Sequence, residues 1–277
     1  MKIHILSDLH VEFYDDPKVL CEKINKLYPN VAHDDILIIA GDLGVAGTSK
    51  KLNDEYKFML KYFGKKWDNV FYVSGNHEYY DRKKTESIQD ISDAIEAYCV
   101  ECGIIFLDND IFETSGYIFV GSTLWTNVGE EAYENMNDKL QAILSRDEVV
   151  SIHKANVKWL NSTLNKLQKL KDNDKERRSP ELAEKPVIVI THHLPLKEVV
   201  HKKFLGEEYS ITHSGYFSDL TDLVTKHRDL ICQWYHGHMH EAYRKKVYDI
   251  HFCANPMGYP DEEMVSPVKV RRLSLKE

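Results

Sequence analysis

Short apolar runs alternate with longer stretches in which apolar residues recur every three or four positions. The runs at 36–40 and 70–73 are apolar throughout, which is typical of strands buried on both faces. The stretches at 18–28, 53–63 and 88–99 have the spacing of amphipathic helices. This alternation predicts a parallel sheet built from β-α-β units.

The middle of the chain breaks this alternation. Residues 111–113 and 117–122 have the pattern of a β-hairpin. The polar, acidic segment at about 125–150 is predicted to form an insertion, or lid, that covers one end of the fold. A long amphipathic helix is expected over 149–170, because apolar residues there keep roughly to one side.

A charged stretch at about 168–186 contains almost no apolar residues and is predicted to be an exposed linker. Strand-like apolar runs resume after it, at 187–190, 231–235 and 247–254. The stretch therefore does not separate two domains. We expect residues 1–277 to form one α/β domain, a length that allows a sizeable core.

The composition is that of an ordinary globular protein, with 29% charged and 43% hydrophobic residues. The formal net charge of −8 disfavours binding to long duplex nucleic acid, which depends on Lys and Arg meeting phosphates. A small phosphorylated ligand stays compatible with this charge, because a bound cation can attract it locally.

The five cysteines are scattered, and their odd number favours a reducing compartment. Cys99 and Cys102 form the one CxxC pair, which we interpret as two half-buried thiols rather than a redox site. No apolar stretch approaches the length of a membrane span. The apolar run in the first residues is too short for a signal peptide. These features predict a cytoplasmic location without a membrane partner.

Five of the apolar runs end in residues that can bind metals, and ligands bind at the carboxyl ends of strands in open α/β sheets. These residues are Asp8 and His10, Asp42, Asn76 and His77, His192 and His193, and His238 and His240. Any one group has an ordinary explanation as a turn or a polar cap. Five such strand ends together favour a metal site instead.

The ligand types restrict the metal. Carboxylates, imidazoles and an amide without a thiolate suit Mn, Fe, Zn or Co and disfavour a structural zinc site of the cysteine type. The candidates outnumber the four ligands of a tetrahedral ion, so we expect two divalent or trivalent ions that share a carboxylate. Mn is our working choice.

The five segments resemble, in the same order, the motifs of the calcineurin-like metallophosphoesterase superfamily. They read SDLH, AGDLG, SGNHEYY, ITHHLP and HGHMH, and they extend across residues 8–240. The surrounding segments resemble the small bacterial-type phosphoesterase and phosphodiesterase branch. The resemblance implies a four-layer α/β/β/α sandwich of two mixed sheets, the metallo-dependent phosphatase fold, with the metals at one end.

Carried over residue by residue, the resemblance implies two groups of metal ligands joined by one bridging carboxylate. The first group is Asp8, His10 and His240. The second group is Asn76, His192 and His238. Asp42 is the bridge between them.

The resemblance also implies the catalytic residues. His77 matches the histidine that faces the phosphate and assists the leaving oxygen, and Asn76 helps to neutralise the phosphoryl oxygens. Further candidates for supporting or substrate-side positions are His193, Glu78, Tyr79 and Tyr80. Trp125 is more plausible as a packing residue under the insertion.

Two positions depart from the motifs of the protein-phosphatase branch. Some superfamily members have GDxxD, in which the second Asp orients the histidine of GNH, but this chain has Val45 at that position. The arginine that precedes GNH in that branch is replaced by Ser74. Both departures favour the phosphodiesterase-like branches.

We therefore predict hydrolysis of a phosphodiester of small nucleotide-like type by a hydroxide that bridges two metals. A phosphomonoesterase acting on a small molecule is one alternative. A catalytically silent binding module with the same fold is another. The sequence leaves the oligomeric state open.

Overall fold

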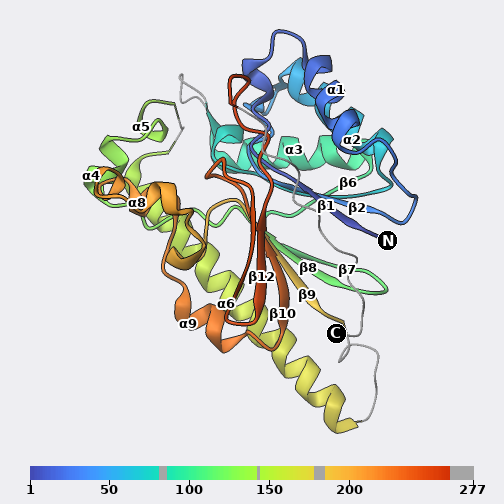
Figure 1. Ribbon diagram of the computed structural model, residues 1–277, viewed down its shortest axis with the longest axis vertical. Coiled ribbons are helices and arrows are strands. Elements are labelled where there is room, and N and C mark those ends of the chain that lie inside the picture. Colours follow the sequence, from blue (N-terminus) through green and yellow to red (C-terminus); the bar gives the residue numbers. More distant parts are fainter. Residues whose placement is uncertain (81–85, 142–143, 178–184, 263–277) are drawn as a thin grey trace.

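The computed structural model describes residues 1–80, 86–141, 144–177 and 185–262 (Figure 1). One of its sheets has four strands, which are, in spatial order, β1 (Ile3–Leu6), β2 (Ile36–Ala40), β5 (Asn69–Val73) and β6 (Ile104–Phe106). All three pairings are parallel. The expectation of two mixed sheets is therefore wrong for this sheet.

Helical crossovers explain the parallel order, because a strand can return in the same direction only through a long connection. Three helices lie between these strands in the chain: α1 (Pro17–Leu27), α2 (Asp54–Lys66) and α3 (Ile88–Cys102). They match the stretches predicted to be helical. Asp16 caps α1 and Ser87 forms a capping box at the start of α3. A small hairpin precedes α2 and consists of β3 (Gly47–Thr48) and β4 (Lys51–Leu52).

The second sheet is mixed and has six strands. Their spatial order is β11 (Tyr243–Val247), β12 (Ile250–Ala254), β10 (Ile231–Tyr235), β9 (Val187–Thr191), β8 (Ile118–Ser122) and β7 (Asp110–Glu113). The central pairings are parallel, and the outer pairs β7–β8 and β11–β12 are antiparallel hairpins. The hairpin β7–β8 confirms the one predicted from the sequence.

The two sheets face each other across a shared apolar core. Phe71 of one sheet stacks on Phe119 of the other, with ring centroids 3.8 Å apart. Helices α1, α2 and α3 cover the outer face of the four-stranded sheet (Figure 1). The outer face of the six-stranded sheet packs against α6 (Arg146–Arg177) and α9 (Thr221–Lys226). This arrangement confirms the four-layer α/β/β/α sandwich.

Helix α6 extends further than its apolar pattern predicts. It continues to Arg177 and so includes the first part of the segment that we expected to be a linker. Residues 168–177 contain good helix formers and neither Gly nor Pro, so the helix can continue after its apolar face ends. Residues 178–184 lie outside the described residues. Neither α6 nor another described helix is both long and apolar enough to cross a membrane.

The segment predicted to be an insertion contains two short helices, α4 (Glu130–Glu134) and α5 (Asp138–Gln141). The first of these packs against α8 (His213–Tyr216), and the Ser214 hydroxyl accepts a hydrogen bond of 2.9 Å from the backbone of Gly129. The remaining short elements are 3₁₀ turns: η1 (Val11–Phe13), η2 (His77–Tyr79), η3 (Lys197–Val199), η4 (Lys202–Phe204) and η5 (Glu207–Tyr209).

Candidate metal centre

The loops that follow β1, β2, β5, β9 and β10 meet at one end of the sandwich. Backbone hydrogen bonds hold the first two loops together, because Leu9 and His10 both donate to the carbonyl of Asp42, at 2.7 and 3.1 Å. The carboxylate of Asp8 accepts a hydrogen bond of 2.8 Å from the backbone of His238, which joins the loop after β10. The side chains at these strand ends are therefore brought to one place.

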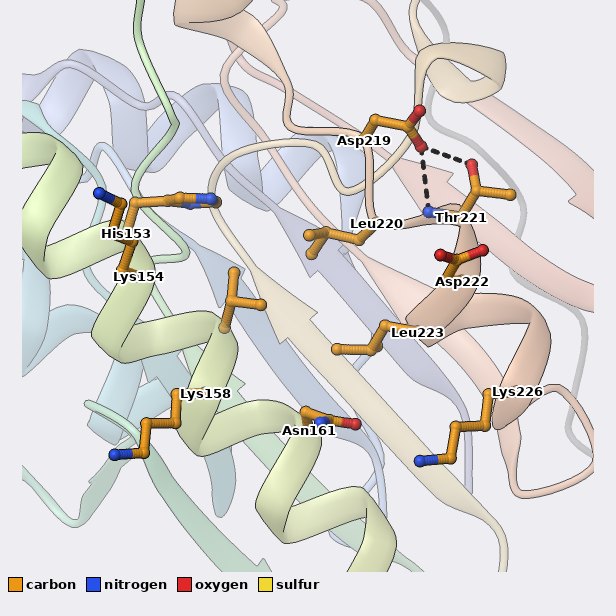
Figure 2. Close-up of a pocket in the computed structure, with 11 residues that line it drawn as sticks. His153, Lys154, Lys158, Asn161, Asp219, Leu220, Thr221, Asp222, Leu223 and Lys226 are labelled. Atoms are coloured by element: carbon orange, nitrogen blue, oxygen red, sulfur yellow. Dashed lines mark hydrogen bonds between the residues drawn. The ribbon is translucent and has the colours of Figure 1, made fainter.

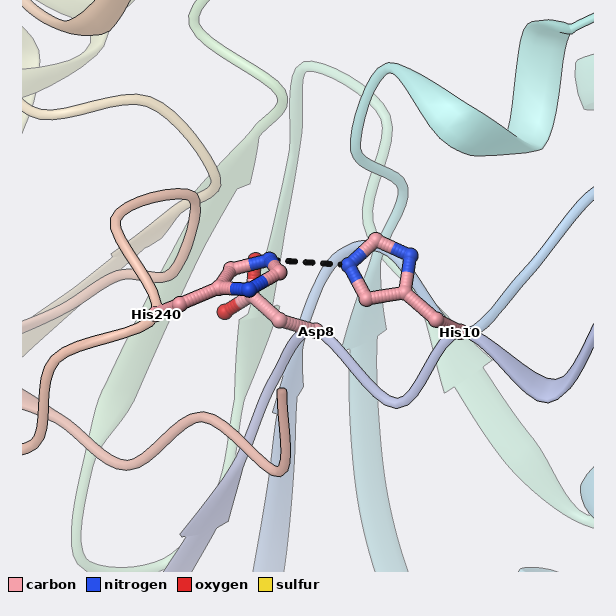
Figure 3. Close-up of side chains that lie close together, drawn as sticks. All are labelled: Asp8, His10 and His240. Carbon is pink, nitrogen blue, oxygen red and sulfur yellow. Dashed lines mark hydrogen bonds and ion pairs between the residues drawn. The ribbon is translucent and has the colours of Figure 1, made fainter. Parts of the chain in front are cut away.

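One group of candidate ligands consists of Asp8, His10 and His240, whose ligand atoms all lie within 4.8 Å of one another. The two imidazoles face each other, with their Nε2 atoms 2.9 Å apart (Figure 3). The Nε2 atom of His240 lies 3.7 Å from the Asp8 carboxylate. This is the first group that the sequence motifs indicated.

A second group contains Asp42, His192 and His238, again with ligand atoms within 4.8 Å of one another. The Nε2 atom of His192 lies 3.3 Å from Asp42 Oδ2 and 3.0 Å from the side-chain oxygen of Asn76. Asp42 Oδ2 also lies 4.0 Å from Nε2 of His10. The carboxylate of Asp42 is therefore placed between the two groups.

The hydrogen bonds of the imidazoles leave lone pairs directed into the centre. His192 donates from Nδ1 to the Ala40 carbonyl at 2.9 Å, which directs its Nε2 atom toward the other candidate ligands. His240 pairs through Nδ1 with the Glu262 carboxylate at 2.8 Å, with the same consequence. Nε2 of His238 is buried and has no hydrogen-bond partner among the described residues. Converging lone pairs and a buried, unpartnered nitrogen fit a cation at this centre.

Five of the seven candidate ligands have a left-handed backbone conformation, which non-glycine residues rarely adopt. Their φ angles lie between 47° and 76°, and the residues are Asp8, His10, Asp42, His238 and His240. This conformation turns each side chain toward the centre at the end of its strand. Such strain typically concentrates at functional sites, where the surrounding structure maintains it.

Electrostatics favour an ionised carboxylate at the middle of the site. Burial alone would raise the pKa of Asp42, but the nearby charges of His192 and His77 hold it well below its ordinary value. Burial lowers the pKa of His77, whereas Asp42 and the Glu12 carboxylate raise it, with a net result of about 9. The centre therefore combines a stable anion with imidazoles that surround it.

Comparison with known proteins decides the family. The family model for calcineurin-like phosphoesterases matches residues 1–242. The chain belongs to this family. It is thus a metal-dependent phosphoesterase, which confirms the resemblance of its sequence motifs and the class of its reaction.

Two known proteins match nearly all of the length of this phosphoesterase. An uncharacterized protein of Acanthamoeba polyphaga mimivirus is 27% identical over 286 residues, which cover 94% of this chain and 92% of the viral protein. The crystal structure of the phosphopantetheinyl hydrolase from Mycobacterium tuberculosis is 18% identical, with a TM-score of 0.62. The likeness covers 94% of this chain and 90% of the mycobacterial one, and it shows a shared fold.

Glu78 of the phosphoesterase supports the loops rather than facing the centre. Its fully buried carboxylate accepts backbone hydrogen bonds from Gly75 at 2.7 Å, Leu43 at 2.7 Å and Asp42 at 3.2 Å. The Tyr72 hydroxyl donates a fourth, at 2.6 Å. Burial and the Asp42 charge raise the pKa of Glu78 to about 7. Glu78 thus holds the loops after β2 and β5 together.

The aromatic candidates separate into packing and pocket residues. Tyr79 is buried, and its hydroxyl hydrogen-bonds to Ser74 and Ser92, each at 2.7 Å. Trp125 is buried in the apolar cluster beside the first sheet, as expected. Tyr80, in contrast, lines a pocket at the centre. His193 is buried and is not among the residues that line that pocket, and its ring centroid lies 4.4 Å from that of His238.

The pocket over the centre has a volume of about 230 Å³ and includes residues that sequence reasoning missed. Its lining is Asp42, Asn76, His77, Tyr80, Asn135, Met136, Asn137, Asp138, Thr212, Tyr216, His238, His240 and Tyr259. Asp138 comes from the predicted insertion, and its carboxylate accepts hydrogen bonds from Asn76 Nδ2 and from the Tyr80 hydroxyl, both at 3.1 Å. Burial raises the pKa of Asp138. No motif in the sequence indicated this contact.

A larger cavity, of about 740 Å³, lies away from the centre between α6 and α9 (Figure 2). None of the candidate ligands lines it. Asp219 accepts hydrogen bonds from the backbone and hydroxyl of Thr221, at 3.1 and 2.6 Å, at the start of α9. This polar pair serves the end of the helix.

Gly75 provides space that the centre requires, and we expect the Gly75→Ala substitution to disrupt it. A Cβ atom there would lie 2.1 Å from Asp42 Oδ1 and 2.7 Å from the Asp42 backbone nitrogen. Forcing this contact should lower the free energy of unfolding by about 1–3 kcal/mol, as measured by urea denaturation of the metal-free protein. Gly116→Ala is the matched control, because a Cβ there meets nothing within 4 Å. Equal stability of the two variants would contradict the steric argument.

Proposed function

We propose that this phosphoesterase hydrolyses a small, nucleotide-like phosphodiester with two metal ions bound at the centre. The observation that carries the proposal is the position of Asp42 between two groups of ligands. Asp8, His10 and His240 would hold one ion, Asn76, His192 and His238 the other, and Asp42 both. Such a pair of ions supplies a nucleophile from water at neutral pH and neutralises the reacting phosphoryl oxygens. The donor set suits Mn, Fe, Zn or Co, and Mn is the ion we would test first.

His77 is the residue that we assign to the leaving group. Its backbone nitrogen donates to Asp42 Oδ1 at 2.9 Å, which ties its position to the proposed bridging carboxylate. Its ring lines the pocket, and Nε2 lies 4.0 Å from Asp42 Oδ2. A proton on this nitrogen is therefore directed into the space where the phosphoester would lie, as a general acid requires.

The charges around the pocket support a diester rather than a monoester. A phosphomonoester carries up to two negative charges at neutral pH, whereas a diester carries one. None of the described residues that line the pocket is Lys or Arg, and the buried carboxylate of Asp138 adds an acidic group. The motif position that holds arginine in the protein-phosphatase branch is Ser74 here. The additional charge of a monoester would thus meet no Lys or Arg side chain in the described lining.

The small pocket also supports the proposed role of the insertion. Residues 135–138 and Tyr216 contribute to its lining, so the segment at about 125–150 and α8 would contact the group attached to the phosphate. We infer that this cover selects the substrate. The pocket volume of about 230 Å³ suits a small ligand group. We therefore do not propose long duplex nucleic acid as a substrate.

A panel of phosphomonoesters, phosphodiesters and cyclic phosphodiesters, assayed with the Mn-loaded protein, tests this proposal. We expect kcat/KM for the best diester to exceed that for the matching monoester by at least about tenfold, which corresponds to about 1.4 kcal/mol. The reverse preference would assign a phosphomonoesterase. A protein that binds metal but hydrolyses no member of the panel would instead act as a binding module.

A further inference from the structure

A carboxylate from an unexpected part of the chain contacts the imidazole of His77. The resemblance to GDxxD motifs places such a group at position 45, which is Val here. In the structure, Oε1 of Glu12 lies 2.7 Å from Nδ1 of His77. Glu12 belongs to the turn η1, which follows the first metal-ligand loop, and its side chain is 16% exposed.

The same carboxylate also contacts a candidate metal ligand. Glu12 Oε1 lies 3.4 Å from Nδ1 of His10, and the ring centroids of His10 and His77 are 4.3 Å apart. Both imidazoles therefore direct Nδ1 toward one carboxylate and Nε2 toward Asp42. Hydrogen bonding at Nδ1 determines which nitrogen carries the proton and which can act at the centre.

The residues around Glu12 leave space for its side chain, and none of those described forms a further hydrogen bond with its carboxylate. A Cβ atom on Gly44 would lie 2.7 Å from Glu12 Oε2, so the second glycine of AGDLG provides the space that this side chain occupies. Oε2 is buried and has no hydrogen-bond partner among the described residues. The polar contacts found for this carboxylate are thus those with the two imidazoles.

We propose that Glu12 is a positioning residue that accepts hydrogen bonds from the Nδ1–H groups of His10 and His77 and so keeps the Nε2 atoms of both rings facing the metal centre. For the role of His77, this inference rests on the proposed function. Glu12, from another loop, would take the place of the missing Asp of GDxxD. Glu12 is not among the described residues that line the pocket over the centre. Its effect on the reaction passes through His77.

Two phosphodiesters that differ only in their leaving group provide the kinetic test. General acid assistance matters more for an alkoxide than for p-nitrophenolate, which leaves readily without a proton. In Glu12→Leu, which removes the acceptor, kcat for an alkyl ester should fall about 10–100-fold, with a much smaller loss for the p-nitrophenyl ester. Glu12→Gln keeps an acceptor oxygen without the charge and should lose less with the alkyl ester. Asp15→Asn, an exposed carboxylate close by in the chain, should change neither rate.

NMR of metal-free protein labelled with ¹⁵N-histidine gives a readout that does not depend on activity. We expect Nδ1 of His10 and of His77 to carry a proton in the wild type and in Asp15→Asn, and to carry it in only part of the molecules in Glu12→Leu. Equal kinetic losses with both leaving groups, or Nδ1 protonation that does not change in Glu12→Leu, would overturn the inference. If the wild type hydrolyses neither diester, the proposed function fails, while Nδ1 protonation still decides whether Glu12 positions the imidazoles.

Discussion

Asp42→Asn should abolish most of the phosphoesterase activity and reduce the bound metal below that of the wild type. The Asp42 carboxylate is buried between the two ligand groups, and neighbouring imidazoles keep it ionised. An amide has the same shape but lacks the charge, and it offers one ligand oxygen instead of two. Because metal ions contribute several kcal/mol to phosphoryl transfer, we expect kcat/KM to fall by about 10³-fold or more. Elemental analysis of the purified variant, together with turnover of a diester, measures both effects.

Asp35→Asn is a matched control, since Asp35 is also a buried carboxylate. It precedes β2, whereas Asp42 follows it, so the two lie at opposite ends of the same strand. The Asp35 carboxylate accepts hydrogen bonds from the backbones of Lys2 and Ala32, at 2.7 and 3.1 Å. This variant should lose stability but keep its metal and its turnover. If Asp42→Asn kept wild-type metal content and rate, Asp42 would not be the shared ligand.

Much of the fold could be predicted because apolar periodicity decides which face of an element is buried. The helices α1, α2 and α3 and the strands beside them follow this rule closely. Strand β11 was not predicted, because it forms an exposed edge with the sequence Tyr-Arg-Lys-Lys-Val, and charged residues on an edge resemble a loop in sequence. The end of α6 was also missed, since helix propensity continues beyond its apolar face.

The candidate ligands could be found from sequence because each follows a strand in a short motif. Motifs do not reveal a contact between distant segments when only one partner is distinctive. Glu12 has no recognisable role until His77 is placed beside it, 65 positions later in the chain. Asp138 contacts Asn76 only because the insertion folds over the centre. From sequence alone, an acidic residue in an acidic segment is expected to be exposed to solvent. Tertiary packing therefore supplies the groups that orient the motif residues.

His77→Ala should reduce turnover strongly while leaving the metal content intact. The His77 ring lines the pocket, but its Nδ1 atom is engaged by Glu12 and its Nε2 atom lies 4.0 Å from Asp42. Its Nε2 atom is thus placed to donate a proton in the pocket. Loss of a positioned general acid typically lowers the rate by about 10²–10⁴-fold. Steady-state kinetics with an alkyl diester and elemental analysis of the same preparation check the two expectations together.

His213→Ala is the matched control for this variant. His213 belongs to α8, and its ring donates a hydrogen bond of 2.7 Å from Nε2 to the Phe204 carbonyl. It is not among the residues that line the pocket over the centre. Its removal should leave turnover near that of the wild type. A His77→Ala enzyme with full activity would refute the assignment of His77 as proton donor. A variant that lost its metal as well would show that His77 supports the ligands, so that its effect on rate could not be attributed to proton transfer.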